Sequence, residues 1–431
     1  LLCALPISYI LGNTVLNSNI IIIIIISLIL FRLEVFRIKF HLIDFLLILF
    51  FSYIFFNGIY NNFFNSDLPI ISEKNIILYK SIMFLRFLLF YFVLRFLVEK
   101  NFINYKYLFL SYGIICLFVA LDVIIQFSIG KDIFGFESMG RRNPGPFGDE
   151  PIAGVFIQRF LVFLLFYFII FSYKNIKFNN TLLFILSIIC IFGAILAGNR
   201  VSVVMIVLTF GFLFAFEKSL RKILTLQFLI GVLAITIIMK NPTEIRSHYK
   251  RLYNGAVETL IYIKSKITSE KIYIVDGKLR NIHLKEIESG LYTWQENKFF
   301  GGGIKSFRWV CNNIDRSKVL HLVSTKGPVN CNNHPHHFYI QIAAELGLVG
   351  LLIFVSLILL ISFKFILIMF KDQKDTDSKR LLFLFFILFF NEVFPLKTAG
   401  SFFTTSNAYF IFFVLPFLSS FIKSSSFTYE K

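Results

Sequence analysis

The sequence predicts an all-α fold: a polytopic membrane helix bundle of about 12 transmembrane helices with one large loop region outside the membrane. Hydrophobic residues make up 57% of the chain, charged residues only 16%, and the mean hydropathy is +0.76. The apolar residues form continuous runs of roughly 17–25 residues, the length that a helix needs to cross a bilayer. A membrane β-barrel would show short segments of alternating polarity, so helices are the expected spanning elements.

Twelve apolar runs are candidate spans, with ends uncertain by several residues. They fall at 1–12, 18–31, 41–57, 76–97, 107–127, 152–172, 181–197, 201–216, 223–239, 342–370, 381–396 and 402–422. The chain starts with Leu1 and its first run is short, so we expect either a missing start codon or a fragment.

The formal net charge is +18, which fits either a nucleic-acid partner or the basic cytoplasmic loops of a membrane protein. Lys and Arg gather in alternate short loops, which favours the second interpretation and predicts no nucleic-acid partner. These loops lie near residues 32–39, 95–106, 174–177, 218–222 and 371–380. Both termini are then cytoplasmic, and the outward loops face the periplasm of a Gram-negative cell.

We expect three parts along the chain: an N-terminal transmembrane bundle of about 9 spans at 1–239, a large periplasmic loop at 240–337, and a C-terminal bundle of about 3 spans at 338–431 with a short cytoplasmic tail. The loop holds six of the seven histidines, and its 16 basic residues outnumber its 8 acidic ones. Anion binding and a generally basic proteome both remain open as reasons for this excess.

Two outward segments carry arginines. The Gly- and Pro-rich loop 140–151 contains Arg141 and Arg142, which can hold phosphate or pair with nearby carboxylates to close the loop. Arg200 lies in the tight turn 198–202 at membrane depth, where a charge indicates either a ligand or a side chain that snorkels to the interface. Arg159, early in a span, is a weaker case of the same kind.

The loop region ends in a histidine cluster at 334–337, followed by an apolar helix. His336 and His337 are expected at this helix's N-terminus, where backbone N–H groups favour anions. Glu345 shares a helix face with His337, and Gly347 and Gly350 allow close helix packing. The alternatives are ordinary structural hydrogen bonds, or a zinc site formed by His334, His336, His337 and His321.

Two further features precede the cluster. Cys311 and Cys331 lie in the same outward segment, so an oxidising compartment would allow them to form a disulfide. The glycines at 301–303 either bring backbone amides close to an anion or form a flexible turn.

At His336 the chain resembles the O-antigen ligase and polymerase family, membrane glycosyltransferases that act on glycans linked to undecaprenyl diphosphate. The family signature is His, usually Asn, Ser or Gln, nine residues and Gly-x-x-Gly. Residues 336–350 match it, except that His337 replaces the usual amide or hydroxyl. The loop 142–154, the turn 198–200, the part 294–331 and the segment 395–407 resemble other parts of the family in kind and order.

The resemblance implies transfer of a glycan from undecaprenyl diphosphate to a hydroxyl at the periplasmic face of the bacterial inner membrane, without metal or other cofactors. We expect His336 to orient or deprotonate the acceptor, and Arg200 to stabilise the departing diphosphate. Expected binding residues are Arg308, Arg142, Arg141, Arg159, His337, Glu345 and Lys397; Gly347, Gly350, Cys311 and Cys331 are expected to be structural.

The resemblance leaves the acceptor open. The leading hypothesis is a ligase, which uses lipid A–core as its acceptor. The alternative is a polymerase, which extends the lipid-linked glycan. A polysaccharide transporter or flippase is a third hypothesis. It predicts charges in the middle of spans, whereas Asp44, Asp122 and Glu392 lie near span ends.

Overall fold

The computed structural model describes residues 1–64, 71–171, 176–240, 244–268, 282–313, 331–370 and 376–423. Helices dominate these residues, and a single isolated bridge, between Lys131 and Glu137, is the extended pairing found among them. The predicted all-α fold class is confirmed. The chain divides into two compact units, each assembled from separate stretches of sequence.

The first unit contains residues Leu1–Ile23, Lys100–Asn254 and Thr376–Asn391. Its helices are η1 (Leu2–Ala4), α1 (Leu5–Ile10), the start of α2 (Asn13–Phe31), α6 (Tyr105–Ile129), η3 (Gly145–Phe147), α7 (Ala153–Phe171), α8 (Ile176–Leu196), α9 (Arg200–Phe216), η4 (Lys218–Leu220), α10 (Arg221–Lys240), the start of α11 (Glu244–Thr268) and most of α16 (Thr376–Val393).

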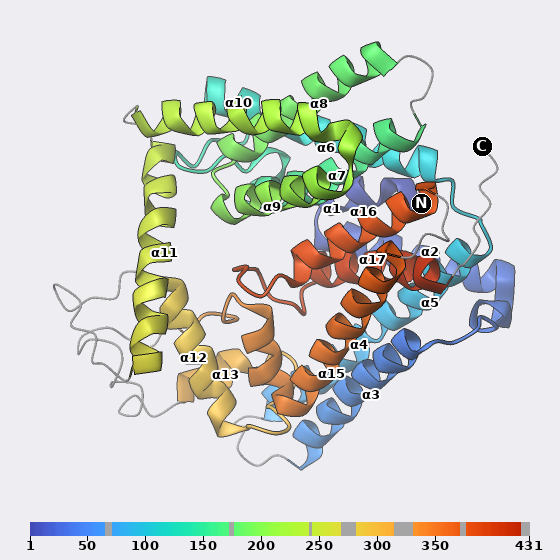
Figure 1. Ribbon diagram of the computed structural model, residues 1–431. Coiled ribbons are helices and arrows are strands. Elements are labelled where there is room, and N and C mark those ends of the chain that lie inside the picture. The colour runs from blue at the N-terminus through green and yellow to red at the C-terminus, as the bar shows by residue number, and fades with distance from the viewer. Residues whose placement is uncertain are drawn as a thin grey trace. The chain divides into compact units, whose positions relative to one another are not determined.

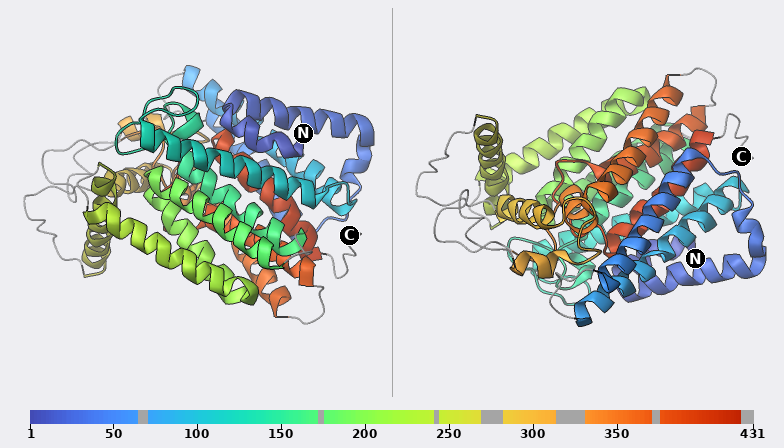
Figure 2. Two further views of the ribbon diagram at one scale, coloured as in Figure 1. Left: turned by 90° about the horizontal axis from the view of Figure 1, so that it is seen from above. Right: turned by 90° about the horizontal axis from the view of Figure 1, so that it is seen from below.

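Small residues allow the helices of this unit to pack closely. A Cβ on Gly113 of α6 would lie 3.0 Å from Leu164 of α7, and one on Gly193 of α8 would lie 2.8 Å from the backbone of Ala120. Helices in a bilayer associate through such close contacts because burial of apolar surface gives little driving force there. As a result α6, α7 and α8 run side by side (Figure 2).

The second unit contains residues Ile24–Glu99, Gly255–Asp375 and Glu392–Lys431. Its helices are the rest of α2, η2 (Arg32–Phe36), α3 (Leu42–Phe63), α4 (Ile71–Phe84), α5 (Arg86–Glu99), the rest of α11, α12 (Ile282–Glu296), α13 (Phe307–Asn313), α15 (Phe338–Met369) and α17 (Thr405–Lys423). In this unit α5 packs against α17, and α15 packs against α3 and α12 (Figure 1).

A buried ion pair joins the membrane helices of the second unit. Arg95 of α5 pairs with Asp44 of α3, and both side chains are fully buried. Arg95 also donates to Ser419 Oγ of α17 at 2.6 Å, and Tyr91 donates to Asp44 at 2.5 Å. Every partner is a hydrogen-bonding group, which is the condition under which a charge is tolerated away from water.

Nine helical stretches among the described residues are long and apolar enough to cross a membrane. They are Asn13–Phe36, Leu42–Phe63, Asn75–Glu99, Tyr105–Ile129, Ala153–Phe171, Asn179–Leu196, Lys218–Lys240, Phe338–Met369 and Thr405–Ile422. The chain is therefore a multi-pass membrane protein.

The predicted count of about 12 spans is not confirmed. Residues 1–12 form only short helices, α9 has 17 residues, and α16 carries Asp377, Lys379, Arg380 and Glu392 among its 18. The predicted division at 239 and 337 stays a prediction; α11, α12 and α13 lie within the predicted loop region.

Candidate active site

The site in the second unit is built around a break in α15 at Gly347. This residue has φ 67° and ψ −170°, so the helical hydrogen bonds are interrupted there. The carbonyl of Glu345 instead accepts from the Gly303 N–H at 2.7 Å, and the N–H of Leu348 donates to Lys298 O at 2.8 Å. The glycine turn at 301–303 and the residues just before it therefore supply the hydrogen bonds that α15 loses.

Gly301 and Gly350 allow this close approach. A Cβ on Gly301 (φ 75°) would lie 2.5 Å from the carbonyl of Glu345, and one on Gly350 would lie 3.1 Å from the ring of Tyr53. The Tyr53 hydroxyl donates to the carbonyls of Phe300 and Leu346, at 3.0 and 2.8 Å. Both signature glycines, Gly347 and Gly350, thus have structural roles in holding the turn against α15.

His337 caps α15. Its Nδ1 accepts from the Ile340 N–H at 3.4 Å, and its Nε2 lies 2.8 Å from the carbonyl of Pro395. Both contacts are made by a neutral ring with the proton on Nε2, and burial lowers the pKa of His337. Asn and Ser, common at this position of the signature, are also preferred helix N-cap residues. The imidazole therefore replaces them in the same capping role.

A buried polar network lies one turn before the break. The carboxylate of Glu345, which is fully buried, accepts from the Lys305 N–H at 2.8 Å and from Gln341 Nε2 at 3.2 Å. Gln341 also donates to Ser401 Oγ at 2.8 Å, and Lys305 Nζ donates to the same oxygen at 3.0 Å. This network joins α15, the 301–306 turn and the segment before α17.

His336 lies at the edge of this network in a strained conformation. Its φ is 50°, and Lys305 has φ 71°; these are two of the four non-glycine residues with positive φ in the described chain. Such conformations cost roughly 1–3 kcal/mol and cluster at functional sites. The carbonyl of His336 accepts from the Ala399 N–H at 2.9 Å, which helps to hold the strained turn.

The imidazole of His336 lies between a carboxylate and a second imidazole. Its Nε2 is 3.8 Å from Oε1 of Glu286, which is almost fully buried in α12. Asn332 donates to the same oxygen at 2.6 Å. The ring centroids of His334 and His336 are 4.1 Å apart. Glu286, rather than Glu345, is therefore the carboxylate that approaches His336.

Basic side chains surround His334. Burial lowers its pKa to about 3, and the neighbouring His336, Lys305 and Arg308 contribute. Its Nε2 is buried without a hydrogen-bond partner among the described residues. A neutral imidazole of this kind can accept a hydrogen bond from a hydroxyl group but cannot act as an acid at neutral pH.

Lys305 and Arg308 form a cationic pair beside the histidines. Burial lowers the pKa of Lys305, Glu345 raises it, and the positive charges of Arg308 and Lys80 lower it again. The Nε of Arg308 is buried without a hydrogen-bond partner among the described residues. Positive charges with unsatisfied donors are suited to binding an anion such as a diphosphate.

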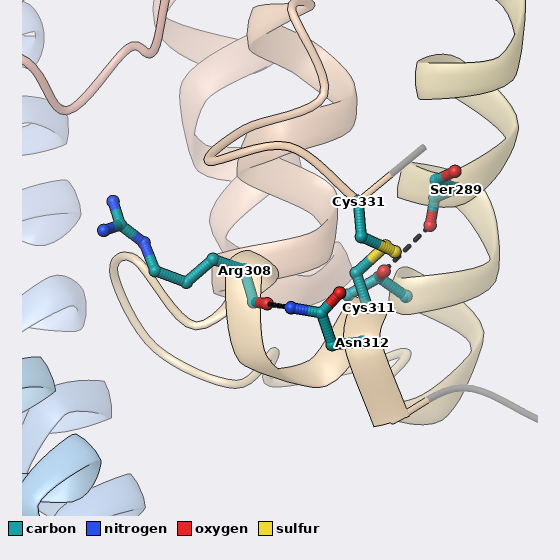
Figure 3. The surroundings of a disulfide bond; sticks show 6 residues. Ser289, Arg308, Cys311, Asn312 and Cys331 are labelled. Carbon is teal, nitrogen blue, oxygen red and sulfur yellow. Dashed lines mark hydrogen bonds between the residues drawn. A yellow bond between two sulfur atoms is a disulfide. The ribbon is translucent and has the colours of Figure 1, made fainter. Parts of the chain in front are cut away.

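A disulfide anchors the helix that carries Arg308. Cys311 of α13 is bonded to Cys331, and their Cα atoms are 5.6 Å apart. Figure 3 shows the Arg308 side chain pointing away from the disulfide, while its carbonyl accepts from Asn312 at 2.7 Å. The bond closes a separation of 20 residues shortly before the histidine cluster, a closure worth roughly 3 kcal/mol in the chain-entropy account.

The first unit brings a second group of arginines together. A Cβ on Gly198 (φ 71°) would lie 2.4 Å from the carbonyl of Arg141, so the turn before Arg200 packs directly on the loop of Arg141 and Arg142. Burial and the charge of Arg141 lower the pKa of Arg142. Arg200 begins α9. Burial raises the pKa of the Tyr249 hydroxyl, and the positive charge of Arg200 opposes that rise.

Two expected binding residues have protein partners instead. Arg159 is almost fully buried in α7, where it donates to the Tyr9 hydroxyl at 3.2 Å. Lys397 Nζ lies 3.2 Å from Glu392 Oε2, and both side chains are buried. Their contacts are those of structural residues.

Sequence reasoning missed Lys305, Glu286 and the role of His334. Lys305 and Glu286 belong to no motif and reach the site only through the folding of α12 and the glycine turn. Among the described residues no group of three metal-ligating side chains is placed to hold an ion. His321, the fourth histidine of the zinc hypothesis, lies outside those residues.

Comparison with known families identifies this region. A family model described as O-Antigen ligase matches residues 182–355. The matched stretch runs from α8 through the histidine cluster into α15, and includes Arg200, Arg308 and His336. A search of curated proteins found no match. The resemblance predicted from residues 336–350 is confirmed, because the family model covers the histidine cluster and both signature glycines.

Proposed function

We propose that the protein transfers a glycan from undecaprenyl diphosphate to a hydroxyl group of lipid A–core at the periplasmic face of the inner membrane. The observation that carries the proposal is the arrangement of His336 between the buried carboxylate of Glu286 and the imidazole of His334, which in turn lies near Lys305 and Arg308. The family match supports the same chemistry, because the residues of this arrangement lie within the matched stretch.

His336 acts as the general base. The acceptor hydroxyl attacks the anomeric carbon of the donor sugar, and its proton passes to the imidazole of His336. The imidazolium that forms is stabilised by Glu286, whose Oε1 is 3.8 Å from Nε2. His334 accepts a hydrogen bond from a sugar hydroxyl through its unpaired Nε2 and so helps to orient the glycan.

The leaving group is the lipid diphosphate. As the new glycosidic bond forms, the bond from the anomeric carbon to the phosphate oxygen breaks, and the diphosphate departs with the electron pair. The charge that develops on it is stabilised by Lys305, whose Nζ already donates to Ser401, and by Arg308. Because the donor is already an activated diphosphate, the proposed step needs no nucleotide.

For the first unit we propose that Arg141, Arg142 and Arg200 bind the anionic donor. Their two loops are packed together, and burial and the charge of Arg141 lower the pKa of Arg142. A bound anion would offset this unfavourable environment of the Arg142 charge. Arg200→Ala should then raise the KM for the donor.

The test uses purified protein in nanodiscs with a defined undecaprenyl-diphosphate glycan and two acceptors, lipid A–core and a second lipid-linked glycan. A ligase forms glycan-bearing lipid A–core. A polymerase instead forms a longer lipid-linked glycan, which would contradict the proposed acceptor. If neither product forms, the proposed chemistry is overturned.

A matched pair of variants tests the role of Glu286 in the same assay. Glu286→Gln should lower kcat with little change in KM, because the substituted amide cannot stabilise the imidazolium. Glu288→Gln, two residues further along α12, removes a similarly buried carboxylate and should leave kcat near the wild-type value.

A further inference from the structure

The helix α11 exposes an apolar face. The exposed fractions are 72% for Tyr253, 38% for Val257, 67% for Leu260 and 48% for Ile261. These four residues are spaced i, i+4, i+7 and i+8, so they form one stripe along the helix. Exposed apolar surface of this kind marks a contact with a partner or a membrane.

The opposite face of α11 is the polar one. Glu258 and Thr259 lie on that side and are half-buried. A helix that packs on a water-soluble domain has the reverse arrangement, with its apolar face buried and its polar face in solvent. The medium against the exposed stripe of α11 is therefore expected to be apolar.

The chain holds α11 beside the bilayer. The membrane-spanning stretch Lys218–Lys240 ends four residues before Glu244, the first residue of α11. Four residues reach at most roughly 14 Å, so α11 begins close to a membrane face. Its first turns, which belong to the same unit as α10, run crosswise to that helix (Figure 1). This placement of α11 beside a membrane face holds for either orientation of the protein in the bilayer.

Basic residues flank the stripe. Lys250 and Lys264 are both exposed. Because an α-helix turns by about 100° per residue, they lie on the same face as Tyr253 and Leu260. Over its whole length α11 has five basic residues and two acidic ones. Apolar side chains bordered by lysines are the pattern of helices that lie in the headgroup region of anionic bilayers.

We propose that α11 lies in the interface of the membrane that α10 crosses, with Tyr253, Val257, Leu260 and Ile261 in the acyl boundary and the flanking lysines on anionic phospholipid headgroups. This assignment gives a physical reason for part of the basic excess of the loop region. It does not depend on the reaction that the protein catalyses.

The experiment places a fluorophore at Leu260→Cys in a Cys3→Ser background, in full-length protein reconstituted in nanodiscs of phosphatidylcholine and phosphatidylglycerol. Quenching by nitroxide-labelled phospholipid is compared with quenching by aqueous iodide. Thr259→Cys, one residue away on the opposite face, is the matched control. We expect lipid quenching several-fold stronger at 260 than at 259, and weak iodide quenching at 260.

Two results would overturn the proposal. Strong iodide quenching at 260 would mean that the stripe faces water. Protection from both quenchers would mean that another segment of this chain covers it. The role of the two lysines is tested separately. Lipid quenching at 260 should weaken when phosphatidylglycerol is omitted. It should also weaken, relative to the protein with both lysines, in the Lys250→Gln, Lys264→Gln double variant. Equal quenching in all three cases would contradict the role of anionic lipid.

Discussion

The backbones of Gly301 and Gly347 pack directly against each other. A Cβ on Gly301 would lie 2.5 Å from the Gly347 nitrogen, and a Cβ on Gly347 would lie 2.2 Å from the carbonyl oxygen of Phe299. Both residues have positive φ, 75° and 67°. Only glycine satisfies both requirements, so the turn at 301–303 and the break in α15 depend on one another.

Gly347→Ala is therefore expected to destabilise the protein and to abolish transfer. The added methyl group meets backbone atoms that cannot move aside. The backbone conformation of Gly347, which is essentially restricted to glycine, adds roughly 1–3 kcal/mol of strain. Thermal unfolding of the purified protein in detergent measures the effect. Gly231→Ala in α10, where a Cβ meets nothing within 4 Å, is the control and should leave the melting temperature unchanged or slightly higher.

His337→Asn should keep transfer activity, because asparagine can cap α15 through its side-chain oxygen. His337→Ala removes the cap and the contact to Pro395, and should lower stability by about 1 kcal/mol. Comparison of the two melting temperatures checks this. A catalytic role for His337 would instead appear as loss of activity in His337→Asn with unchanged stability.

The protein should lose stability as the pH falls below about 6.5, partly through His334. Its folded-state pKa of about 3 lies below the unfolded value, so the unfolded chain binds the proton first and is favoured as the pH decreases towards 3. His337, whose pKa is also lowered, acts in the same direction. His334→Gln should flatten the melting temperature between pH 5 and 7; an unchanged slope would contradict this assignment.

The sequence was most informative where a local pattern is compatible with few structures. Long apolar runs predicted membrane helices, and the signature at 336–350 predicted the family. The partner of His336 was not predictable, because Glu286 precedes it by 50 residues and approaches it only through the packing of α12 on α15. Lys397 has the sequence context of a ligand, but its contact with Glu392 depends on the turn between α16 and α17.

The count of spans shows the same limit. Hydropathy alone does not separate a spanning helix from a short buried one, and the run at 1–12 folds as two short helices, η1 and α1. The charges at the start of α16 likewise belong to contacts made within the first unit. Arg380, for example, lies 3.0 Å from Glu217.

The proposed reaction requires His336 to take the acceptor proton. The direct measurement is the rate of glycan transfer by purified His336→Ala, with His337→Asn as the control from the same cluster and thermal unfolding as the test of folding. We predict a loss of about 100-fold or more in kcat at a melting temperature near that of wild type. Activity within a few-fold of wild type in folded His336→Ala would contradict the account.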